Sequence, residues 1–114
     1  MKSINGETFE IQLLDDATVS FKCALRLSGT DDYAPILQLL KETLNKSIVP
    51  IVIDMRELDF LNSSGITMFS RFAIEARDHD GADVQVLASQ GVPWHARSLK
   101  NLQRLMPSLK IVLS

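Results

Sequence analysis

The sequence contains few of the residues on which disulfides, metal sites and membrane spans depend. It has one cysteine, Cys23, so an internal disulfide and a multi-cysteine metal site are both excluded. The two histidines, His79 and His95, lie far apart and show no metal-ligand spacing. No apolar run approaches the ~20 residues of a membrane-spanning helix, and the N-terminus lacks the layout of a signal peptide. We therefore expect a cytoplasmic protein without direct membrane insertion.

Charge of one sign is not in excess either. The chain carries 12 basic and 14 acidic residues, which give a formal net charge of -2. Because no basic block is present, nucleic acid is a poor candidate partner. The sequence also lacks a nucleophile elbow, a Walker loop and a dinucleotide-binding fingerprint, so we expect no enzyme activity. We expect His79, which lies between two acids, to be solvated, and His95 to pack on a helix surface.

The first third of the chain has the pattern of a β-hairpin. Apolar and polar residues alternate over residues 18–28, and residues 8–14 show the same pattern more briefly. This period of two predicts two antiparallel strands, with Asp15 and Asp16 in the turn between them. The alternation places Cys23 on the buried face, as a core cysteine.

Helix and strand patterns interleave along the rest of the chain. Apolar residues at three- and four-residue steps predict helices over residues 33–46, 63–78 and 93–106. Apolar runs predict strands over residues 48–54, 84–88 and 109–113. Together these elements predict an α/β fold with a single mixed sheet, an N-terminal antiparallel hairpin and helices packed on the sheet. Because 46% of the residues are apolar, enough for one core, we expect one domain over residues 1–114.

One segment, with the sequence DFLNSSGI over residues 59–66, joins a predicted strand to a predicted helix. Asn62, Ser63 and Ser64 lie where that helix begins, and a helix start presents unpaired backbone N–H groups and partial positive charge. Such a position favours side-chain oxygens and anions, including a phosphoryl group. Capping of the helix by these side chains is also sufficient on its own to account for the segment.

This segment and an earlier one resemble the motifs of a known family. Residues 29–32 match a Gly-x-x-Asp stretch at Gly29 and Asp32, and residues 62–66 match an Asp-Ser-Ser-Gly-hydrophobic turn. With strands and helices in the same order, nearly the whole chain resembles the STAS domain of bacterial anti-sigma-factor antagonists. The resemblance implies a protein switch in a bacterial cytoplasm, acting in signal transduction and transcription regulation, with no cofactor.

The resemblance also implies how the switch works. Ser63 would be phosphorylated by a partner serine kinase that is itself an anti-sigma factor, with Asp32, Asn62, Ser64 and Gly65 around the site. The unphosphorylated form would bind this kinase and free the sigma factor, and a metal-dependent serine phosphatase would reset the switch. A phosphoryl group adds roughly -1.5 to -2 charges, which a partner surface carrying carboxylates or an apolar patch would not tolerate.

Asn62 is the main departure from the family, which usually has aspartate at this position. Asparagine keeps the capping oxygen, but it lacks the charge that would orient a kinase-bound magnesium or the serine hydroxyl. Two alternatives stay open, and Asn62 supports the first of them. One is a STAS subunit that is not phosphorylated and docks constitutively in a larger transporter or sensory complex. The other is a small-molecule or nucleotide-binding module, which a sizeable pocket beside residues 29–32 and the Ser63 turn would favour.

The helix after the motif indicates a surface for a partner. A helical wheel places Ile66, Phe69, Ala73 and Ala76 on the core side. Thr67, Arg71 and Ile74 lie on the opposite side, with Met68 on the flank, and we interpret these four as a partner-binding face. Coverage by another helix or a loop is the alternative reading of that face. Trp94, which begins the third helix, is either packed locally or an interface anchor.

Overall fold

The structure, a computed structural model, describes residues 3–15, 17–46, 50–79 and 81–114. Its elements run in the order β1 (Ser3–Asn5), β2 (Phe9–Leu13), β3 (Thr18–Leu25), α1 (Gly29–Asn45), β4 (Ile51–Leu61), α2 (Ser63–Arg77), β5 (Val84–Ala88), α3 (Pro93–Leu105) and β6 (Lys110–Leu113). Asp16, Ile48, Val49 and Asp80, which the sequence assigned to a turn, a strand and a helix stop, lie outside the described residues.

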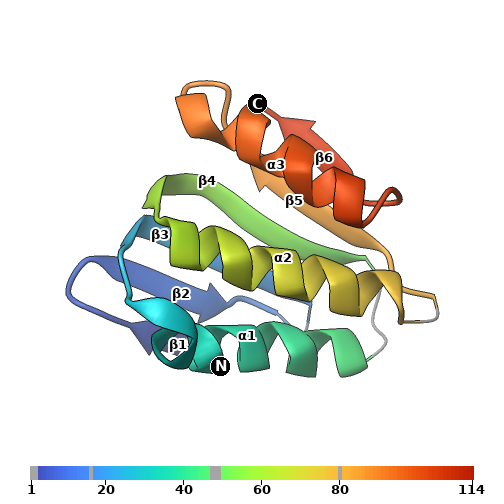
Figure 1. Ribbon diagram of the computed structural model, residues 1–114, viewed down its shortest axis with the longest axis horizontal. Helices are drawn as coiled ribbons and strands as arrows, with labels where there is room; N and C mark the ends of the chain where they lie inside the picture. Colours follow the sequence, from blue (N-terminus) through green and yellow to red (C-terminus); the bar gives the residue numbers. More distant parts are fainter. Residues whose placement is uncertain (1–2, 16, 47–49, 80) are drawn as a thin grey trace.

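All six strands form one sheet, in which their spatial order is their order in the sequence, β1 to β6 (Figure 1). The pairs β1–β2 and β2–β3 are antiparallel, and the pairs from β3 through β6 are parallel. Each parallel step passes through one helix, and right-handed crossovers that always advance in one direction place every helix on the same face. The predicted mixed α/β sheet is therefore confirmed, with β1 as an additional edge strand.

Two boundaries near the motif differ from the prediction. Helix α1 begins at Gly29 rather than residue 33. Ser28 before it is extended, and Gly29 makes the turn into the helix with a φ of 70°, which a glycine adopts without strain. The Gly-x-x-Asp stretch is thus the first turn of α1. Strand β4 continues to Leu61, whereas the prediction ended it at residue 54. The first residues of the DFLNSSGI segment therefore belong to the sheet, where Leu61 pairs with Leu25 of β3. Because β4 ends at Leu61 and α2 begins at Ser63, a single residue, Asn62, lies between them.

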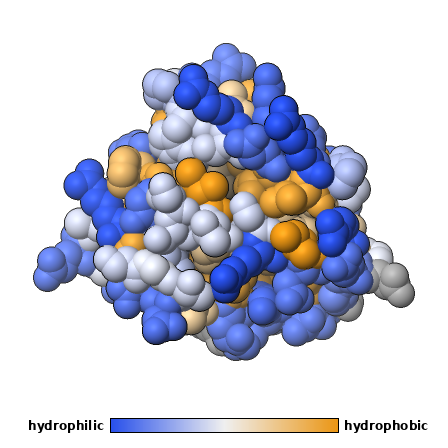
Figure 2. Space-filling model, viewed as in Figure 1, coloured by the Kyte–Doolittle hydropathy of each residue, from blue (hydrophilic) through white to orange (hydrophobic). Residues whose placement is uncertain are grey.

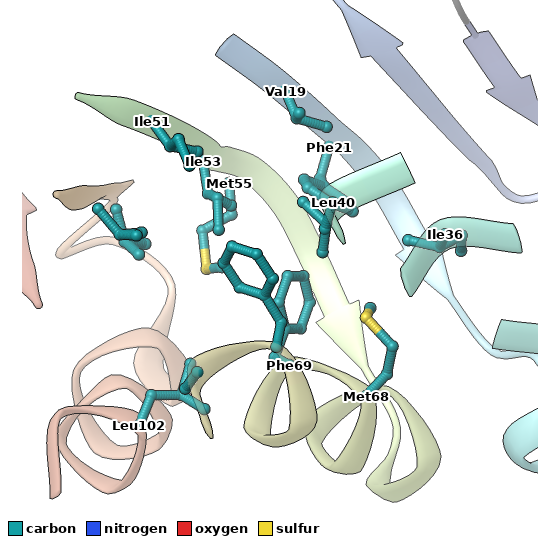
Figure 3. Packing of buried hydrophobic residues seen from close by; sticks show 14 of the residues in the cluster. Val19, Phe21, Ile36, Leu40, Ile51, Ile53, Met55, Met68, Phe69 and Leu102 are labelled. Atoms are coloured by element: carbon teal, nitrogen blue, oxygen red, sulfur yellow. The ribbon is translucent and has the colours of Figure 1, made fainter. Parts of the chain in front are cut away.

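The core lies between the helix layer and the inner face of the sheet (Figure 3). Phe21 of β3 and Phe69 of α2 meet edge to face with their ring centroids 5.2 Å apart. Met68, expected on the helix flank as part of a partner-binding face, is only 3% exposed and belongs to this core. The wheel was wrong at Met68 because α1 packs beside α2 and widens the buried arc, which also takes in Phe72.

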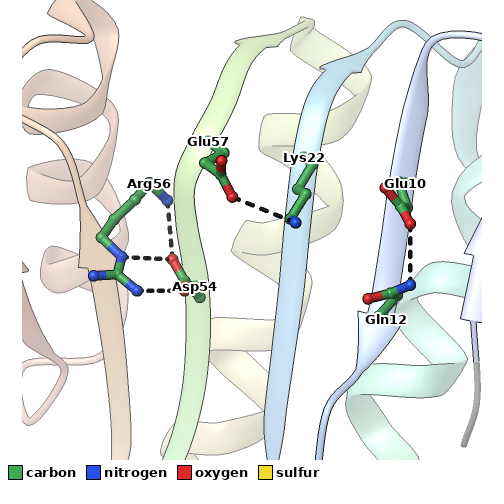
Figure 4. A network of polar contacts seen from close by, with 6 residues as sticks. All are labelled: Glu10, Gln12, Lys22, Asp54, Arg56 and Glu57. Atoms are coloured by element: carbon green, nitrogen blue, oxygen red, sulfur yellow. Dashed lines mark hydrogen bonds and ion pairs between the residues drawn. The ribbon is translucent and has the colours of Figure 1, made fainter.

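The outer face of the sheet carries no helix and is polar instead (Figure 4). Arg56 donates two side-chain hydrogen bonds to the Asp54 carboxylate, and these bonds lower the pKa of Asp54. Lys22 and Glu57 form an ion pair across β3 and β4 at 3.5 Å. Parallel sheets are usually covered on both faces, and this polar lining explains how the face remains open.

Cys23 is exposed, so its placement in the core was wrong. The pairing of β3 with β4 shifts register on both sides of Lys22–Cys23, and Cys23 has a φ of 73°. Such irregularities are β-bulges, which break the strict alternation of inward and outward side chains. The alternation therefore holds as far as Phe21 and fails at Cys23.

His95 is fully buried, which corrects its expected position on a helix surface. Its Nδ1 accepts the Ser89 N–H at 3.0 Å, so the proton lies on Nε2, which donates to the Leu58 carbonyl at 2.8 Å. Trp94 packs against it edge to face and donates its indole N–H to the Asp59 carbonyl at 2.8 Å. Local packing is thus the reading that describes Trp94.

Two further expectations concern the exposure of His79 and the length of the helices. His79, expected to be solvated, is half-buried. Among the described residues, no helix is both long and apolar enough to span a membrane.

Candidate functional site

The starts of α1 and α2 lie side by side at one end of the sheet (Figure 1). Both helices follow parallel neighbouring strands, β3 and β4, whose carboxyl ends meet at the same edge. The Asn62 N–H donates to the Leu25 carbonyl at 3.3 Å, and the Gly29 N–H donates to Ser64 Oγ at 3.3 Å. The topology therefore brings together the two sequence motifs, which are more than thirty residues apart.

Asn62 links the two helix starts through its side chain. Its Oδ1 accepts the Gly65 N–H at 3.0 Å, which caps α2, and also the Tyr33 hydroxyl at 2.7 Å. Its Nδ2 donates to the Leu27 carbonyl at 2.7 Å. The predicted capping role is confirmed, and the contacts with Tyr33 and Leu27 extend it to the neighbouring helix.

These contacts give a structural reason for asparagine at this position. An ionised aspartate has no donor, so its second oxygen would face the Leu27 carbonyl oxygen, acceptor against acceptor. The Tyr33 side chain is 1% exposed, and burial raises the pKa of its hydroxyl, which keeps it a neutral donor. Sequence reasoning missed Tyr33. Its spacing from Ile36 and Leu40 predicts a buried position, but nothing in the spacing identifies its hydrogen-bond partner.

Gly65 leaves room for the side chains of the same cluster. A Cβ at this position would collide with the Leu61 side chain and lie 2.9 Å from the Tyr33 hydroxyl oxygen. Such approaches force a shift in the neighbours, because real Cβ atoms essentially never come this close. A glycine two residues after Ser63 thus lets Tyr33 reach Asn62.

The two serines of the motif differ in their surroundings. Ser64 is half-buried, and its hydroxyl accepts the Gly29 N–H. Ser63 is exposed, and its hydroxyl makes no hydrogen bond within the part of the chain that the structure describes. Its carbonyl accepts the Thr67 hydroxyl at 3.1 Å, as an ordinary part of the helix. Ser63 therefore presents a free hydroxyl on a firmly capped helix start.

Charge differs between the two helix starts. The first turn of α1 holds Asp31 and Asp32, and an Asp32 oxygen accepts the Ser28 N–H at 3.2 Å. The first turn of α2 holds no acidic residue. Since a helix N-terminus carries partial positive charge, an anion on Ser63 would be tolerated by its own helix. The nearest acidic helix turn is that of α1.

A groove of about 210 Å³ runs between α1 and α2 from this end. Thr30 and Ser64 line it near the helix starts, and Met68 lines it farther along. The other three residues of the expected partner-binding face, Thr67, Arg71 and Ile74, are exposed. Figure 2 shows apolar side chains gathered near the middle of this face of the molecule, with hydrophilic side chains around them.

Solved structures of other proteins share the fold of this chain. No protein-family description and no curated protein sequence matches the chain. A crystal structure of an anti-sigma factor antagonist from Mycobacterium paratuberculosis matches 90% of this chain and 84% of its own, with a TM-score of 0.60 and 20% identity. The protein has a STAS-type fold.

A second solved structure agrees with this fold. A chain of the crystal structure of the diguanylate cyclase SiaD in complex with its activator SiaC, from Pseudomonas aeruginosa, matches over the full length of both chains. The TM-score is 0.73 and the identity is 14%. At these identities the likeness establishes the fold, which is the fold that the motifs and element order predicted.

Proposed function

We propose that this protein is a partner-switching regulator of the anti-sigma-factor-antagonist type. With a free Ser63 hydroxyl it binds a serine-kinase/anti-sigma-type protein, and phosphorylation of Ser63 releases it. A serine phosphatase restores the free hydroxyl. The setting is a bacterial cytoplasm, and the output is control of transcription.

The observation that carries this proposal is the difference between the two serines. The Ser64 hydroxyl is held by the Gly29 N–H, whereas the Ser63 hydroxyl is exposed and unbonded within the described chain. Asn62, Tyr33 and Gly65 fix the backbone that presents Ser63. An accessible hydroxyl on a rigid support is one that a kinase can align for attack.

The phosphoryl donor of the switch is ATP, which the kinase binds. The Ser63 oxygen forms a bond to the γ-phosphorus of ATP, the bond from that phosphorus to ADP breaks, and the serine proton passes to a base of the kinase. The phosphatase reverses the mark with water, releasing inorganic phosphate. The phosphoserine carries roughly -1.5 to -2 charges, next to the Asp31–Asp32 turn of α1. Partner surfaces that accept the free hydroxyl would be repelled by this local charge.

The test compares two variants as baits in cells of the native host. We expect Ser63→Ala to retain a kinase-type partner and Ser63→Asp to recover at least tenfold less of it, by quantitative mass spectrometry. Circular dichroism of both variants serves as the folding control. Equal recovery on both baits would contradict the charge switch and favour a constitutive subunit of a larger complex.

Asn62 favours that second candidate function. Both ends of its amide are engaged inside the protein, so its side chain is committed to structure rather than to a kinase-bound magnesium. SiaC is described as the activator of an enzyme. A protein of this fold that docks on an enzyme without being phosphorylated is therefore the alternative to the kinase switch.

A small-molecule or nucleotide module is less well supported. The pocket that would favour it does exist beside Thr30 and Ser64, but its volume is about 210 Å³. Pockets for drug-sized ligands and cofactors span roughly 300–1,000 Å³ and bury most of the ligand. The part of the groove beside Thr30 and Ser64 is smaller than this range, and its continuation past Arg71, of about 310 Å³, is an open hollow on the surface.

A further inference from the structure

The groove between α1 and α2 extends well beyond Ser63. Leu37 and Lys41 of α1 line it on one side, and Arg71 of α2 lines it on the other. The hollow continues along the same helices, where Ile74 and Glu75 line it together with Leu37, Lys41 and Arg71. It therefore spans nearly three turns of α2, from Ser64 to Glu75.

The groove combines an apolar lining with basic side chains. Leu37 is half-buried against the core, Met68 is buried, and Ile74 is 38% exposed. Arg71 is exposed and makes no ion pair within the described residues. Lys41 forms an ion pair with Glu75 at 3.5 Å, and the two side chains are 36% and 54% exposed.

Charge and size together select the kind of occupant. The groove residues include two cations and one acid, on a chain whose net charge is -2, so the groove is locally basic on an acidic protein. The two parts of the groove have volumes of about 210 Å³ and about 310 Å³, and both are open to solvent along the helices. One or two aliphatic side chains of another protein would fill it, in the way that interface anchors fill partner pockets.

We propose that the α1–α2 groove receives a segment of a partner protein that inserts an apolar side chain between Leu37 and Met68 and sets a carboxylate against Arg71. This inference rests on the proposed function, because it describes how the partner reaches the Ser63 end of the molecule. The carboxylate supplies the ion-pair partner that Arg71 lacks in the described chain. The apolar anchor contacts Leu37 and Met68, and the same segment continues along the helices and buries the exposed part of Ile74.

A phage-displayed library of random 12-residue peptides, selected on the purified wild-type protein, tests this inference. We expect the enriched peptides to combine an aliphatic residue with Asp or Glu. Synthetic copies should bind Arg71→Glu and Ile74→Asp at least tenfold more weakly than wild type. Leu37→Asp, which also touches the core, serves as a third variant once circular dichroism shows that it folds.

Matched controls lie elsewhere on the chain. Arg97→Glu reverses an exposed charge on α3, and Val112→Asp places a charge at an exposed apolar position on β6. Both should bind the selected peptides as wild type does. The inference is overturned if the peptides bind Arg71→Glu and Ile74→Asp at wild-type strength, if basic peptides are enriched, or if no peptide is enriched over an unrelated protein.

Ser63→Asp separates this inference from the proposed function. Loss of peptide binding in Arg71→Glu together with retained binding in Ser63→Asp would support the groove and count against the charge switch. Loss in Ser63→Asp alone would support the switch and reject the groove. Loss in both variants, with the controls unaffected, is the result that both proposals predict.

Discussion

The starts of α2 and α3 are held in different ways, although each helix follows a parallel strand. Asn62 caps α2 with its side chain and is half-buried, and the next residue, Ser63, is exposed. Helix α3 has no side-chain cap at Val92. Its first turn is fixed instead by Trp94 and the fully buried His95, which both bond to carbonyls of β4. One start is arranged around an accessible hydroxyl, and the other is arranged around buried contacts.

Stability and access are therefore divided between two neighbouring helix starts at the same edge of the sheet. Buried hydrogen bonds contribute most to stability when their loss leaves partners unsatisfied, as at His95. The network around Asn62 is half-buried, so part of its loss can be offset by water. Substitutions at the two helix starts should therefore differ in the size of their effect on unfolding, and in their dependence on pH.

The largest effect is expected for His95→Ala. The change leaves the Leu58 carbonyl and the Ser89 N–H unpaired and opens a cavity under α3, which together cost about 2–4 kcal/mol of unfolding free energy. Urea denaturation measures this loss. Arg97→Ala, at an exposed position two residues along the same helix, is the matched control and should change stability by less than ~0.5 kcal/mol. A similarly small loss for His95→Ala would break the comparison.

The second effect concerns Asn62→Asp and its dependence on pH. Facing the Leu27 carbonyl, the aspartate favours its protonated form, which can donate as the amide does, so its pKa in the folded state is raised above the unfolded ~3.9. The variant should match wild type below pH ~4 and lose about 1–2 kcal/mol as pH rises through the folded-state pKa.

Urea denaturation of Asn62→Asp and wild type between pH 3.5 and 8 checks this sign. Asn62→Ala is the control, because it removes the cap at every pH. Asn62→Asp could instead become more stable relative to wild type as pH rises. In that case the helix dipole, the Tyr33 hydroxyl and the Gly65 N–H stabilise the carboxylate more than the Leu27 carbonyl repels it, and the explanation given for Asn62 is wrong.

A smaller effect is expected for Tyr33→Phe. The variant loses one hydrogen bond to Asn62 without leaving a large cavity, which costs about 1 kcal/mol. Because Tyr33 and Asn62 share this bond, the loss should shrink in an Asn62→Ala background, and a double-mutant cycle measures the coupling. Fully additive losses would show that the two side chains do not act as one unit.

The smallest effect on stability is expected for Ser63→Asp. The Ser63 hydroxyl has no bond to lose in the described chain, and a carboxylate in the first turn of a helix is slightly favourable, by ~0.3–1 kcal/mol at low salt. Thermal unfolding at low and high salt measures the change. A loss above ~1 kcal/mol would contradict the picture of an exposed, unengaged hydroxyl.

The fold could be predicted from the sequence because its signals are local. The alternation over β2 and the start of β3, the helical spacing in α2 and the apolar run of β5 each follow from a period that neighbouring residues define. The place of Asn62 at the start of α2 was also predictable, since capping depends on residues three apart.

The rest depended on contacts between distant residues. Cys23 lies beside a bulge that depends on the pairing of β3 with β4. Met68 is buried because α1 packs beside α2, which the spacing within α2 does not show. His95 was misplaced because its partners are 6 and 37 residues away. The second role of Asn62, toward Tyr33 and Leu27, is likewise a long-range contact that no sequence spacing encodes.

The proposed switch depends on Ser63 as the residue that is phosphorylated. Intact-mass analysis of the protein purified from its native cells across growth and stress conditions, with the site mapped by fragmentation, tests it most directly. The account predicts one phosphoryl group, on Ser63, which disappears in Ser63→Ala and persists in Ser64→Ala. An unmodified protein under every condition, or a phosphoryl group on another residue, would contradict it.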